Sequence, residues 1–392
     1  MKRLTWQQAT IEEKDARYSP VKSSPARRVT RIALAAFSVL VVLSILTLAT
    51  VSYMFSAPRY KGPKSDHFDG KRFVNLEPIE QHGFRDLIKF MFFTDHGPWE
   101  GMVENRSYPP PPERVDNGDL QVTFINHSTV LIQMDGLNIL TDPIWSERCS
   151  PVSWTGPKRV RAPGIPFDSL PPIDYILLSH NHYDHLDLPT LKRLAAQYDM
   201  PIITGLGNRA LLEQNGLRNV VELDWGSQVE ASHGITFFCR SARHFSGRGL
   251  DDRQATLWVS FLIKGPSGAV YFAGDTGFGR HFEEIEKEFG PVRLALIPIG
   301  AYLPRWFMKG VHVSPEEAVR AHQLLKASTS VAIHFGTFRL GADGQDQAES
   351  ELKKAVQKVD SGTPRFWILD FGESRPVPAA DQSAAMPPAA AM

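Results

Sequence analysis

Hydrophobic and polar positions divide the chain of 392 residues into five parts. No residue from Ile32 to Pro58 is charged, a run of 27 positions. About 20 apolar residues cross a bilayer as a helix, so this run predicts an N-terminal transmembrane helix. The polar and basic residues 1–31 before it are expected to be disordered. Residues 59–118 contain four consecutive prolines near their end, at 109–112, and are typical of a linker or a wrapping arm.

Residues 119–375 have the pattern of a folded domain. Helices are expected over Leu188–Tyr198, which is amphipathic, and from Ser314, where a capping box includes proline at the first helical position. Strands and helices alternate in two halves, which predicts a layered α/β sandwich. The Ala/Pro-rich tail, residues 376–392, is expected to be unstructured. The expected strands are Gln121–Ile125, Thr129–Met134, Leu137–Thr141, Asp174–Ser179, 235–240, 256–264, 269–274, Arg293–Ile297, Ser330–His334 and Phe366–Leu369.

The uncharged segment 32–58 has two interpretations. One is a cleaved signal peptide, with Thr47–Ala49 or Phe55–Ala57 as the cleavage site. The apolar run and the polar segment before it are both long for a signal peptide, so an uncleaved single-pass anchor is favoured. Basic residues are denser before the run than after it, which places the N-terminus in the cytoplasm. The domain is then expected outside the cytoplasm, at the inner membrane.

Charge and cysteine content narrow the function classes. Lys+Arg and Asp+Glu each number 43, and this balance argues against a nucleic-acid partner. The two cysteines, Cys149 and Cys239, are too few for a disulfide framework or a Cys-rich zinc module. We expect two buried thiols, with a single bridge as the alternative in an oxidising compartment.

Four residues of metal-binding type follow the predicted strand Asp174–Ser179. They are His180, His182, Asp184 and His185, within six positions. A single histidine would more often be a core residue, but four such residues in one loop predict a metal site. Imidazole and carboxylate ligands without cysteine suit zinc, with iron or manganese as alternatives.

Three further candidates leave later strands. His244, Asp275 and His334 each come at or after the end of an apolar run, where loops carry function on a rigid scaffold. Each alone could be structural. Together with the loop 180–185 they predict a site for two metal ions.

These residues resemble the metallo-β-lactamase superfamily, and within it the branch of N-acyl-phosphatidylethanolamine-hydrolysing phospholipase D. The resemblance covers roughly residues 119–375 and implies an αββα sandwich. It goes beyond the metal ligands in the stretches Leu140–Ile144, Gly156–Arg159, Leu170–Asp174, Ser179–Asp187, Glu222–Trp225, Phe272–Gly277, Ile297–Tyr302, Pro304–Lys309, His312–Val313, Pro315–Val319 and His334–Phe338.

The resemblance implies a role for each ligand. One metal ion would be held by His180, His182 and His244, and the second by Asp184, His185 and His334, with Asp275 bridging them. It also implies that Tyr183 and His312 lie in the substrate pocket. The structural alternatives are packing at the base of the loop for Tyr183 and a surface position for His312.

Other positions are more ambiguous. His127 stands where the family more usually has glycine before the histidine and alanine after it. We interpret it as a residue behind the metal ligands or in the pocket wall. Asp142 and Asp187 are expected either to hydrogen-bond the metal histidines or to form turns. The segment Phe245–Leu250 departs from the family pattern, which leaves substrate selectivity open.

The implied activity is a phosphodiesterase that releases an N-acylethanolamine and phosphatidic acid from a phospholipid. Metal-activated water would attack phosphorus, oriented by Asp184, with Asp275 bridging the metals. The apolar residues Phe90–Phe93 could contact the bilayer, although burial under the domain is favoured. Alternative functions are a metallo-hydrolase acting on a lactone or a soluble phosphodiester, and an envelope protein with a relict site. Related enzymes are often dimers, so a homodimer stays open.

Overall fold

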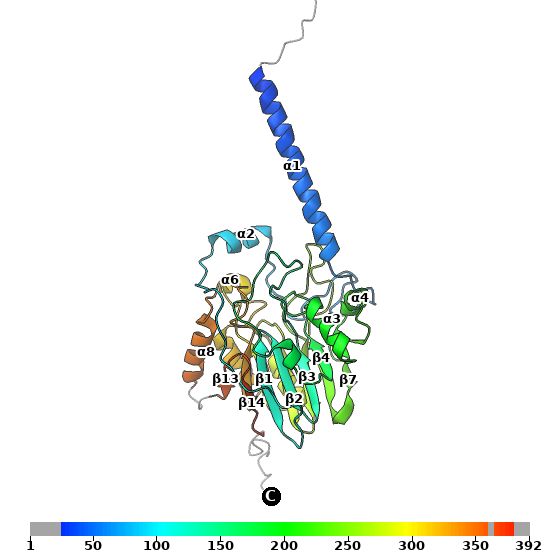
Figure 1. Cartoon of the computed structure of the whole chain (residues 1–392), viewed down its shortest axis with the longest axis vertical. Coiled ribbons are helices and arrows are strands. Elements are labelled where there is room, and N and C mark those ends of the chain that lie inside the picture. The colour runs from blue at the N-terminus through cyan, green and yellow to red at the C-terminus, as the bar shows by residue number, and fades with distance from the viewer. Residues whose placement is uncertain (1–24, 360–363, 380–392) are drawn as a thin grey trace, which may run out of the picture. The chain divides into compact units, whose positions relative to one another are not determined.

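The computed structural model describes residues 25–359 and 364–379 and divides into two compact units, residues 1–51 and 52–392. The described part of the first unit belongs to one helix, α1 (Pro25–Phe55), whose last residues belong to the second unit (Figure 1). An 18-residue window of α1 has a mean hydropathy of 2.7. By length and composition α1 could cross a membrane, as a signal sequence also could.

The predicted anchor, residues 32–58, and the observed helix α1 differ at both ends. Residues 25–31, assigned above to a disordered segment, are helical, and residues 1–24 lie outside the described residues. Pro25 suits a first turn, because its missing N–H would have no helical partner there. α1 ends at Phe55, and Ala57 is buried in the second unit, where its backbone N–H donates to the Asp252 carboxylate (2.7 Å).

Two seven-stranded sheets form the centre of the second unit. The first has the order β14 (Ser374–Pro376), β1 (Leu120–Asn126), β2 (Thr129–Met134), β3 (Leu137–Thr141), β4 (Tyr175–Leu178), β5 (Ile202–Gly205) and β6 (Val220–Leu223). The second has the order β13 (Phe366–Trp367), β12 (Thr329–Ile333), β11 (Leu294–Pro298), β10 (Gly268–Phe272), β9 (Ser260–Gly265), β8 (Thr236–Arg240) and β7 (Gln228–Glu230). Strands β1–β3 and β7–β10 pair antiparallel, whereas β3–β6 and β10–β13 pair parallel.

The main core lies between the two sheets. Phe124 of β1 and Leu177 of β4 belong to the same buried cluster as Phe261 of β9 and Leu296 of β11. Strands that are buried on both faces have continuous apolar sequences. The run Tyr175–Leu178 is one of these, which is why its sequence predicts a strand.

Helices cover the outer faces of both sheets, so the predicted αββα sandwich is confirmed (Figure 1). A second apolar cluster holds α3 (Leu188–Gln197) and α4 (Asn208–Gln214) against the first sheet. Apolar side chains of α5 (His281–Phe289), α7 (Pro315–Leu324) and α8 (Gln347–Gln357) enter the main core. The remaining helical segments are α2 (Phe84–Phe93), α6 (Arg305–Met308) and the short 3-10 turns Phe167–Ser169 and Ser232–Gly234.

The start of α7 has the predicted capping box. The Glu317 N–H donates to Ser314 Oγ (3.2 Å), and the Glu317 carboxylate accepts from the Ser314 N–H (2.9 Å). These two bonds satisfy backbone groups that a helix leaves unpaired at its first turn.

Residues 59–118 lie along the domain rather than away from it. The Tyr60 N–H donates to the Ala255 carbonyl (3.1 Å), and the Gly97 N–H donates to the Ala342 carbonyl (2.8 Å). The sequence left two interpretations of this segment open, a linker and a wrapping arm. These contacts fit the wrapping arm and not the linker.

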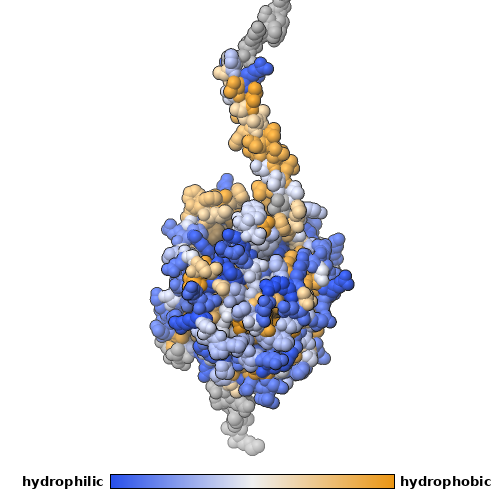
Figure 2. Space-filling model, in the orientation of Figure 1, coloured by the Kyte–Doolittle hydropathy of each residue, from blue (hydrophilic) through white to orange (hydrophobic). Residues whose placement is uncertain are grey.

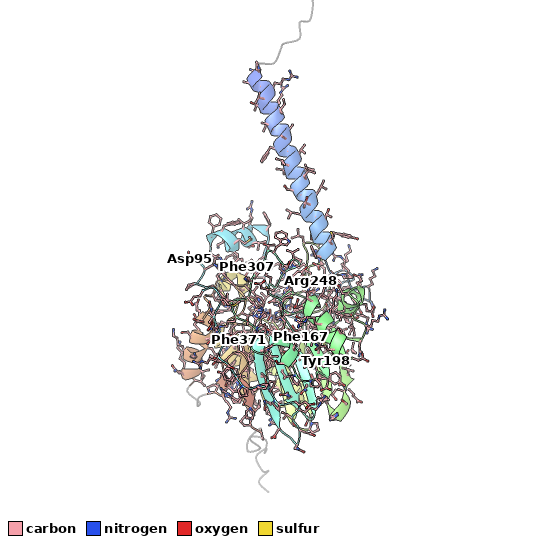
Figure 3. The ribbon with its side chains drawn as sticks, viewed as in Figure 1. Asp95, Phe167, Tyr198, Arg248, Phe307 and Phe371 are labelled. Carbon is pink, nitrogen blue, oxygen red and sulfur yellow. The ribbon has the colours of Figure 1, made fainter. Side chains whose placement is uncertain are left out.

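Helix α2, within this arm, has an exposed apolar surface. Phe92 and Phe93 are 69% and 78% exposed, and no residue of α2 is buried. Phe90 stacks on Phe307 with 5.0 Å between ring centroids. The favoured prediction of burial for Phe90–Phe93 is therefore wrong, because α2 rests on the surface through contacts on one side. Figure 2 shows apolar residues gathered over α2, and Figure 3 shows Phe307 beneath it.

Several strand boundaries differ from the predictions. The predicted strand 256–264 begins only at Ser260, because the preceding residues bond to loops; the Val259 N–H donates to the Ser179 carbonyl (2.8 Å). β10 ends at Phe272, so Asp275 follows it in a loop. Strands β5, β6 and β7 were not predicted, because polar residues or glycine interrupt these short segments, whereas β4 is a continuous apolar run.

The C-terminal tail begins later than predicted. Pro376 belongs to β14, and the Val377 N–H donates to the Leu120 carbonyl (2.7 Å). Residues 380–392 of the predicted tail lie outside the described residues. The prediction of two buried free thiols, Cys149 and Cys239, is confirmed.

Arg293 is a buried cation that joins several segments around β14. Its guanidinium donates to the carbonyls of Gly118 (2.8 Å), Ser267 (2.7 Å), Val377 (2.7 Å) and Pro378 (2.9 Å). We expect Arg293→Met to lower the free energy of unfolding by about 2–4 kcal/mol, because four carbonyls lose a charged donor. Denaturant unfolding followed by tryptophan fluorescence measures it, with the exposed Arg339→Met as control. Equal stability of the two variants would contradict the prediction.

Candidate metal centre

The metal-binding candidates meet where strand ends of the two sheets come together. The loop 179–187 follows β4, and Asp142 follows β3, which pairs parallel to β4. His334 follows β12, and Asp275 follows β10. Parallel strands bring their carboxyl ends to one edge of a sheet, so each sheet contributes side chains to a common buried cluster.

His180, His182 and His244 form the first group of ligand atoms. His182 Nδ1 lies 2.8 Å from His180 Nε2 and 3.3 Å from His244 Nε2. The ring nitrogens of all three histidines lie within 4.8 Å of one another, a spacing that permits them to share one metal ion.

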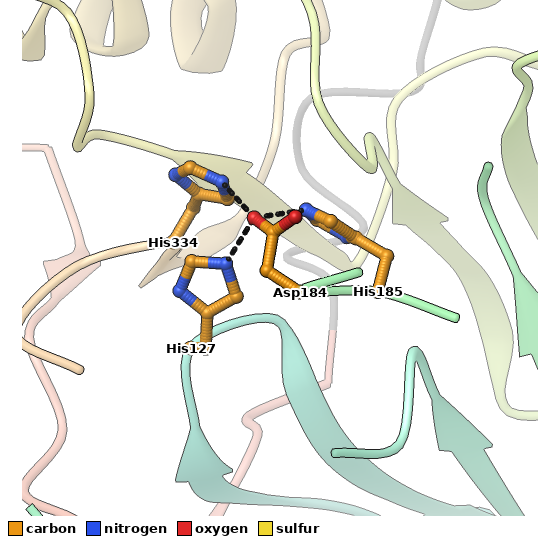
Figure 4. Close-up of side chains that lie close together, drawn as sticks. All are labelled: His127, Asp184, His185 and His334. Atoms are coloured by element: carbon orange, nitrogen blue, oxygen red, sulfur yellow. Dashed lines mark hydrogen bonds and ion pairs between the residues drawn. The ribbon is translucent and has the colours of Figure 1, made fainter. Parts of the chain in front are cut away.

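Asp184, His185, His334 and His127 form the second group (Figure 4). Asp184 Oδ2 lies 2.9 Å from His127 Nε2, 3.2 Å from His185 Nε2 and 3.3 Å from His334 Nε2. The structure therefore brings together the three residues that the family resemblance assigned to a second metal ion and adds His127 to them.

Asp275 lies between the two groups. Its Oδ2 atom is 3.0 Å from His334 Nε2 and 3.2 Å from His185 Nε2. The same oxygen is 3.7 Å from His244 Nε2 and 4.0 Å from His180 Nε2. One carboxylate thus faces ligands of both groups, which is the position that a bridging ligand needs.

His127 was difficult to place from sequence, because it is a lone histidine in the short turn between β1 and β2. His127 and His334 both have positive φ angles, 48° and 59°. Such angles are uncommon for residues other than glycine and cluster at functional sites. The His334 N–H donates to the His127 carbonyl (2.7 Å), which fixes the two backbones to each other.

Asp142 orients two of the histidines from behind. The His185 Nδ1–H donates to Asp142 Oδ2 (2.6 Å). Ser179 Oγ donates to the same oxygen (2.6 Å) and accepts from His180 Nδ1–H (2.9 Å). Both rings therefore direct Nε2 into the cluster. Ser179 was missed in the sequence, where a serine before a histidine gives no separate signal.

His244 and Asp187 are held in different ways. The His244 Nδ1–H donates to the Val311 carbonyl (3.0 Å), which leaves Nε2 facing the cluster. The Asp187 carboxylate instead accepts from Ser146 Oγ (2.7 Å) and Thr190 Oγ1 (2.5 Å). Asp187 bonds to none of the described histidines, so of its two interpretations only the turn-forming one fits.

The two predicted substrate contacts lie beside the cluster. His312 is buried, with Nδ1 4.0 Å from Asp275 Oδ2 and its ring 5.1 Å from that of His244. Tyr183 is partly buried, and the guanidinium of Arg248 lies 3.8 Å above its ring. Arg248 also donates to the Asn181 (2.8 Å) and Leu186 (2.9 Å) carbonyls, which braces the metal-binding loop.

Most histidines of the cluster are neutral. Burial lowers the pKa of His182 to about 4, that of His312 to about 4 and that of His127 to about 3. Burial also holds the pKa of His180 and of His244 well below the usual value. Neutral imidazole is the form that binds a metal ion.

Two histidines behave in the opposite way. Burial opposes a charge on His334, but Asp275 outweighs it and raises the pKa of His334 to about 9. Burial likewise opposes a charge on His185, yet Asp275 and Asp184 raise its pKa well above the usual value. In turn, burial alone would raise the pKa of both carboxyls, but the charge of His185 holds the pKa of each well below its usual range. The carboxylates of Asp184 and Asp275 therefore favour a positive charge next to them.

Several atoms that face the cluster have no hydrogen-bond partner among the described residues. They include Asp275 Oδ1, and also His185 Nε2 and His334 Nε2, whose contacts with the Asp184 and Asp275 carboxylates at 3.0–3.3 Å are ion pairs without hydrogen-bond geometry. A buried polar atom without a partner costs roughly 1–3 kcal/mol. Metal coordination would satisfy such atoms, and it would supply the positive charge that the two carboxylates favour. The residues present therefore fit a metal centre.

Comparison with known proteins agrees with this geometry. Residues 137–335 match the family model described as the beta-lactamase superfamily domain. The chain belongs to the metallo-β-lactamase superfamily. The matched range contains all seven metal-binding residues predicted from the sequence, whereas His127 lies before it.

Individual relatives indicate the branch of the superfamily to which the chain belongs. An uncharacterized protein of Mycobacterium tuberculosis is 38% identical over 304 residues, 75% of this chain and 80% of that protein. N-acyl-phosphatidylethanolamine-hydrolyzing phospholipase D 1 of Caenorhabditis elegans is 38% identical over 266 residues, 65% of this chain and 75% of that protein. This metallo-hydrolase thus belongs to the branch that contains the Caenorhabditis enzyme.

A solved structure shows the shared fold. A possible metal-dependent hydrolase from Veillonella parvula superposes with a TM-score of 0.54, at 17% identity, over 65% of this chain and 98% of that one. At this identity the likeness concerns the fold of the metallo-β-lactamase domain and not its substrate.

The bonds of Asp142 predict a measurable effect on metal affinity. We expect Asp142→Asn to weaken metal binding about 10- to 100-fold, because the amide no longer holds His185 and Ser179 as the carboxylate does. Competition with a chromogenic chelator measures it. Asp135→Asn changes a buried carboxylate that accepts from Ser267, and it is the control. Unchanged metal affinity in Asp142→Asn would refute the orienting role.

Proposed function

We propose that the chain is a membrane-anchored dinuclear zinc phosphodiesterase that hydrolyses N-acyl-phosphatidylethanolamine to an N-acylethanolamine and phosphatidic acid. The position of Asp275 carries this proposal, because its Oδ2 lies 3.0–4.0 Å from nitrogens of both histidine groups. The likeness to the Caenorhabditis phospholipase D supports the substrate class.

The donor set supports zinc. Imidazole nitrogens and carboxylate oxygens, with no sulfur, suit zinc, and iron or manganese fit the same set. In this assignment one ion would be held by His180, His182 and His244 and the other by Asp184, His185 and His334, and Asp275 would be shared. When bound, the two ions would supply an activated water near neutral pH and neutralise charge on the phosphoryl group.

The protein's own groups have distinct tasks in this proposal. Asp142 and the Val311 carbonyl hold imidazoles so that their free nitrogens face the cluster. Asp184 accepts from His127 Nε2–H and orients the attacking water. Tyr183 and His312, which border the cluster, contact the substrate. A lone pair of that water would form the new bond to phosphorus, the bond to the N-acylethanolamine oxygen would break, and the proton lost by the water would end on that oxygen.

The N-terminal half of the chain supports a membrane substrate. Helix α1 has the length and composition of a membrane span, and the exposed apolar residues of α2 are suited to a bilayer surface. Arg85 and Lys89 lie on α2 among these residues, in a pattern typical of interfacial helices. We infer a single-pass protein of the inner membrane with its catalytic domain outside the cytoplasm, and a homodimer as a further possibility.

A lipid assay tests the proposed activity directly. Wild-type protein in mixed micelles is expected to release phosphatidic acid from N-acyl-phosphatidylethanolamine, to lose this activity after chelation and to regain it with zinc. Asp275→Ala is expected to lower the rate at least about 100-fold, because both ions lose their shared ligand. Asp174→Ala, which removes a carboxylate paired with Arg114 at the surface, is the control.

Other outcomes of this assay favour the alternatives. Opening of a lactone without release of phosphatidic acid would identify a different metallo-hydrolase. Less than one bound metal ion per chain, together with no hydrolysis, would favour an envelope protein with a relict site. Equal rates for wild type and Asp275→Ala would remove the bridging role.

The exposed surface of α2 gives a separate prediction. We expect Phe92→Ser combined with Phe93→Ser to reduce hydrolysis of vesicle substrate about 10-fold or more, because apolar area that enters the interface is lost. Hydrolysis of a short-chain substrate in solution should stay unchanged, since neither residue lies at the metal cluster. Glu283→Ser combined with Glu284→Ser, on the outer face of α5, is the control. Equal losses on both substrates would indicate a folding defect instead.

A further inference from the structure

Three backbone segments meet beside the metal-binding loop, and each brings an arginine. The Tyr60 N–H donates to the Ala255 carbonyl (3.1 Å), and the Phe73 N–H donates to the Gln254 carbonyl (2.9 Å). The residues just before Tyr60, Phe73 and Gln254 are Arg59, Arg72 and Arg253. Two segments of the N-terminal arm are thus fixed to the loop that follows His244, and their cations gather there.

The arm residues line a hollow with excess positive charge. Its volume is about 500 Å³, and its lining residues are Arg59, Asp69, Lys71 and Arg72. The Asp69 carboxylate accepts the backbone N–H groups of Lys71 (2.7 Å) and Arg72 (2.8 Å), so it is used to fix the turn. Across the described residues, the side chains of Lys71 and Arg72 form no hydrogen bond or ion pair. Arg59 donates to the backbone carbonyl of Asp251, so none of the three cations that line the hollow forms an ion pair with a carboxylate of the described residues.

Arg253 connects this hollow to the metal cluster. Its guanidinium lies 3.9 Å above the ring of Phe245, and that ring is 4.6 Å from the ring of His182. Arg253 is exposed, and its side chain has no hydrogen-bond or ion-pair partner in the part of the chain that the structure describes. Partial desolvation of its guanidinium, together with the nearby charge of Arg72, lowers the pKa of Arg253. The hydrogen bond between the Phe73 N–H and the Gln254 carbonyl places these two arginines on adjacent segments, and an anion between them would relieve the repulsion.

Chain connectivity indicates which anion is available. Arg59 is the fourth residue after Phe55, where α1 ends, so the extended chain separates them by at most about 14 Å. If α1 crosses a bilayer, Arg59 lies at the depth of the lipid headgroups, where anionic phospholipids attract basic residues. The abundant anion at that depth is a lipid phosphate.

We propose that Arg59, Lys71, Arg72 and Arg253 form a binding site for the phosphate of an anionic phospholipid headgroup beside the metal centre. Guanidinium groups bind phosphate oxygens through paired, charge-assisted hydrogen bonds. The departure of residues 245–250 from the family pattern lies next to this site. The lipid bound there need not be the one that is hydrolysed. The binding site and the proposed phosphodiesterase activity can therefore be tested separately.

Binding of a short-chain lipid tests the site without turnover. The full chain in neutral detergent is titrated with dihexanoyl-phosphatidylglycerol, dihexanoyl-phosphatidylcholine or inorganic phosphate, and heat is measured by calorimetry. We expect the anionic lipid to bind at least 10-fold more tightly than the other two probes, with affinity that falls as salt is added. Arg72→Gln combined with Arg253→Gln should weaken it about 10- to 100-fold, because two charged donors are lost.

Two matched variants separate recognition from folding. Arg193→Gln combined with Arg209→Gln removes the same charge from surface arginines that pair with carboxylates, and it should bind the lipid as wild type does. Arg72→Lys combined with Arg253→Lys keeps the charge and should retain most of the affinity. Equal loss in the lysine and glutamine variants would show a structural role and overturn the proposal. Wild-type affinity in the glutamine variant, or equal binding of inorganic phosphate, would also overturn it.

Discussion

Two carboxylates buried among imidazoles impose the constraint on which the rest of this structure depends. Asp184 and Asp275 lie inside the protein, where an unpaired negative charge is expensive. They are stable there because histidine nitrogens surround them and because this arrangement can hold cations. The strand order, the turn at His127 and the bonds of Asp142 all serve to bring these groups to one point. The geometry of the metal-binding cluster thus compensates two buried negative charges as well as placing the groups that the chemistry needs.

Much of this arrangement could be predicted from sequence because it follows from local rules. The run Tyr175–Leu178 is apolar because it is buried on both faces, and the residues after a buried parallel strand lie at the functional edge. The loop 180–185 and the later candidates His244, Asp275 and His334 could be selected in this way. Their division between two metal ions came from the family resemblance, and the distances around Asp275 are consistent with it.

What could not be predicted depends on contacts between distant parts of the chain. His127 gave no signal of its own, because its position is defined by Thr337 and His334, more than 200 residues later. Asp187 had the right residue type for supporting a histidine, but Ser146 and Thr190 bind its carboxylate instead. The exposure of Phe92 and Phe93 likewise could not be read from an apolar run, since the same run suits a core or a membrane surface.

The predicted metal ligands follow strands of both sheets, and this has a consequence for the stability of the fold. His180 and His185 follow a strand of the first sheet, whereas His244, Asp275 and His334 follow strands of the second. A metal ion held by residues from both would act as a cross-link between the two halves of the chain, closing loops of up to about 150 residues. Binding to the folded state alone shifts the folding equilibrium toward it in proportion to free metal concentration. The stability of the folded protein would then depend on the metal concentration in its compartment. Loss of the metal would weaken the packing between the two sheets.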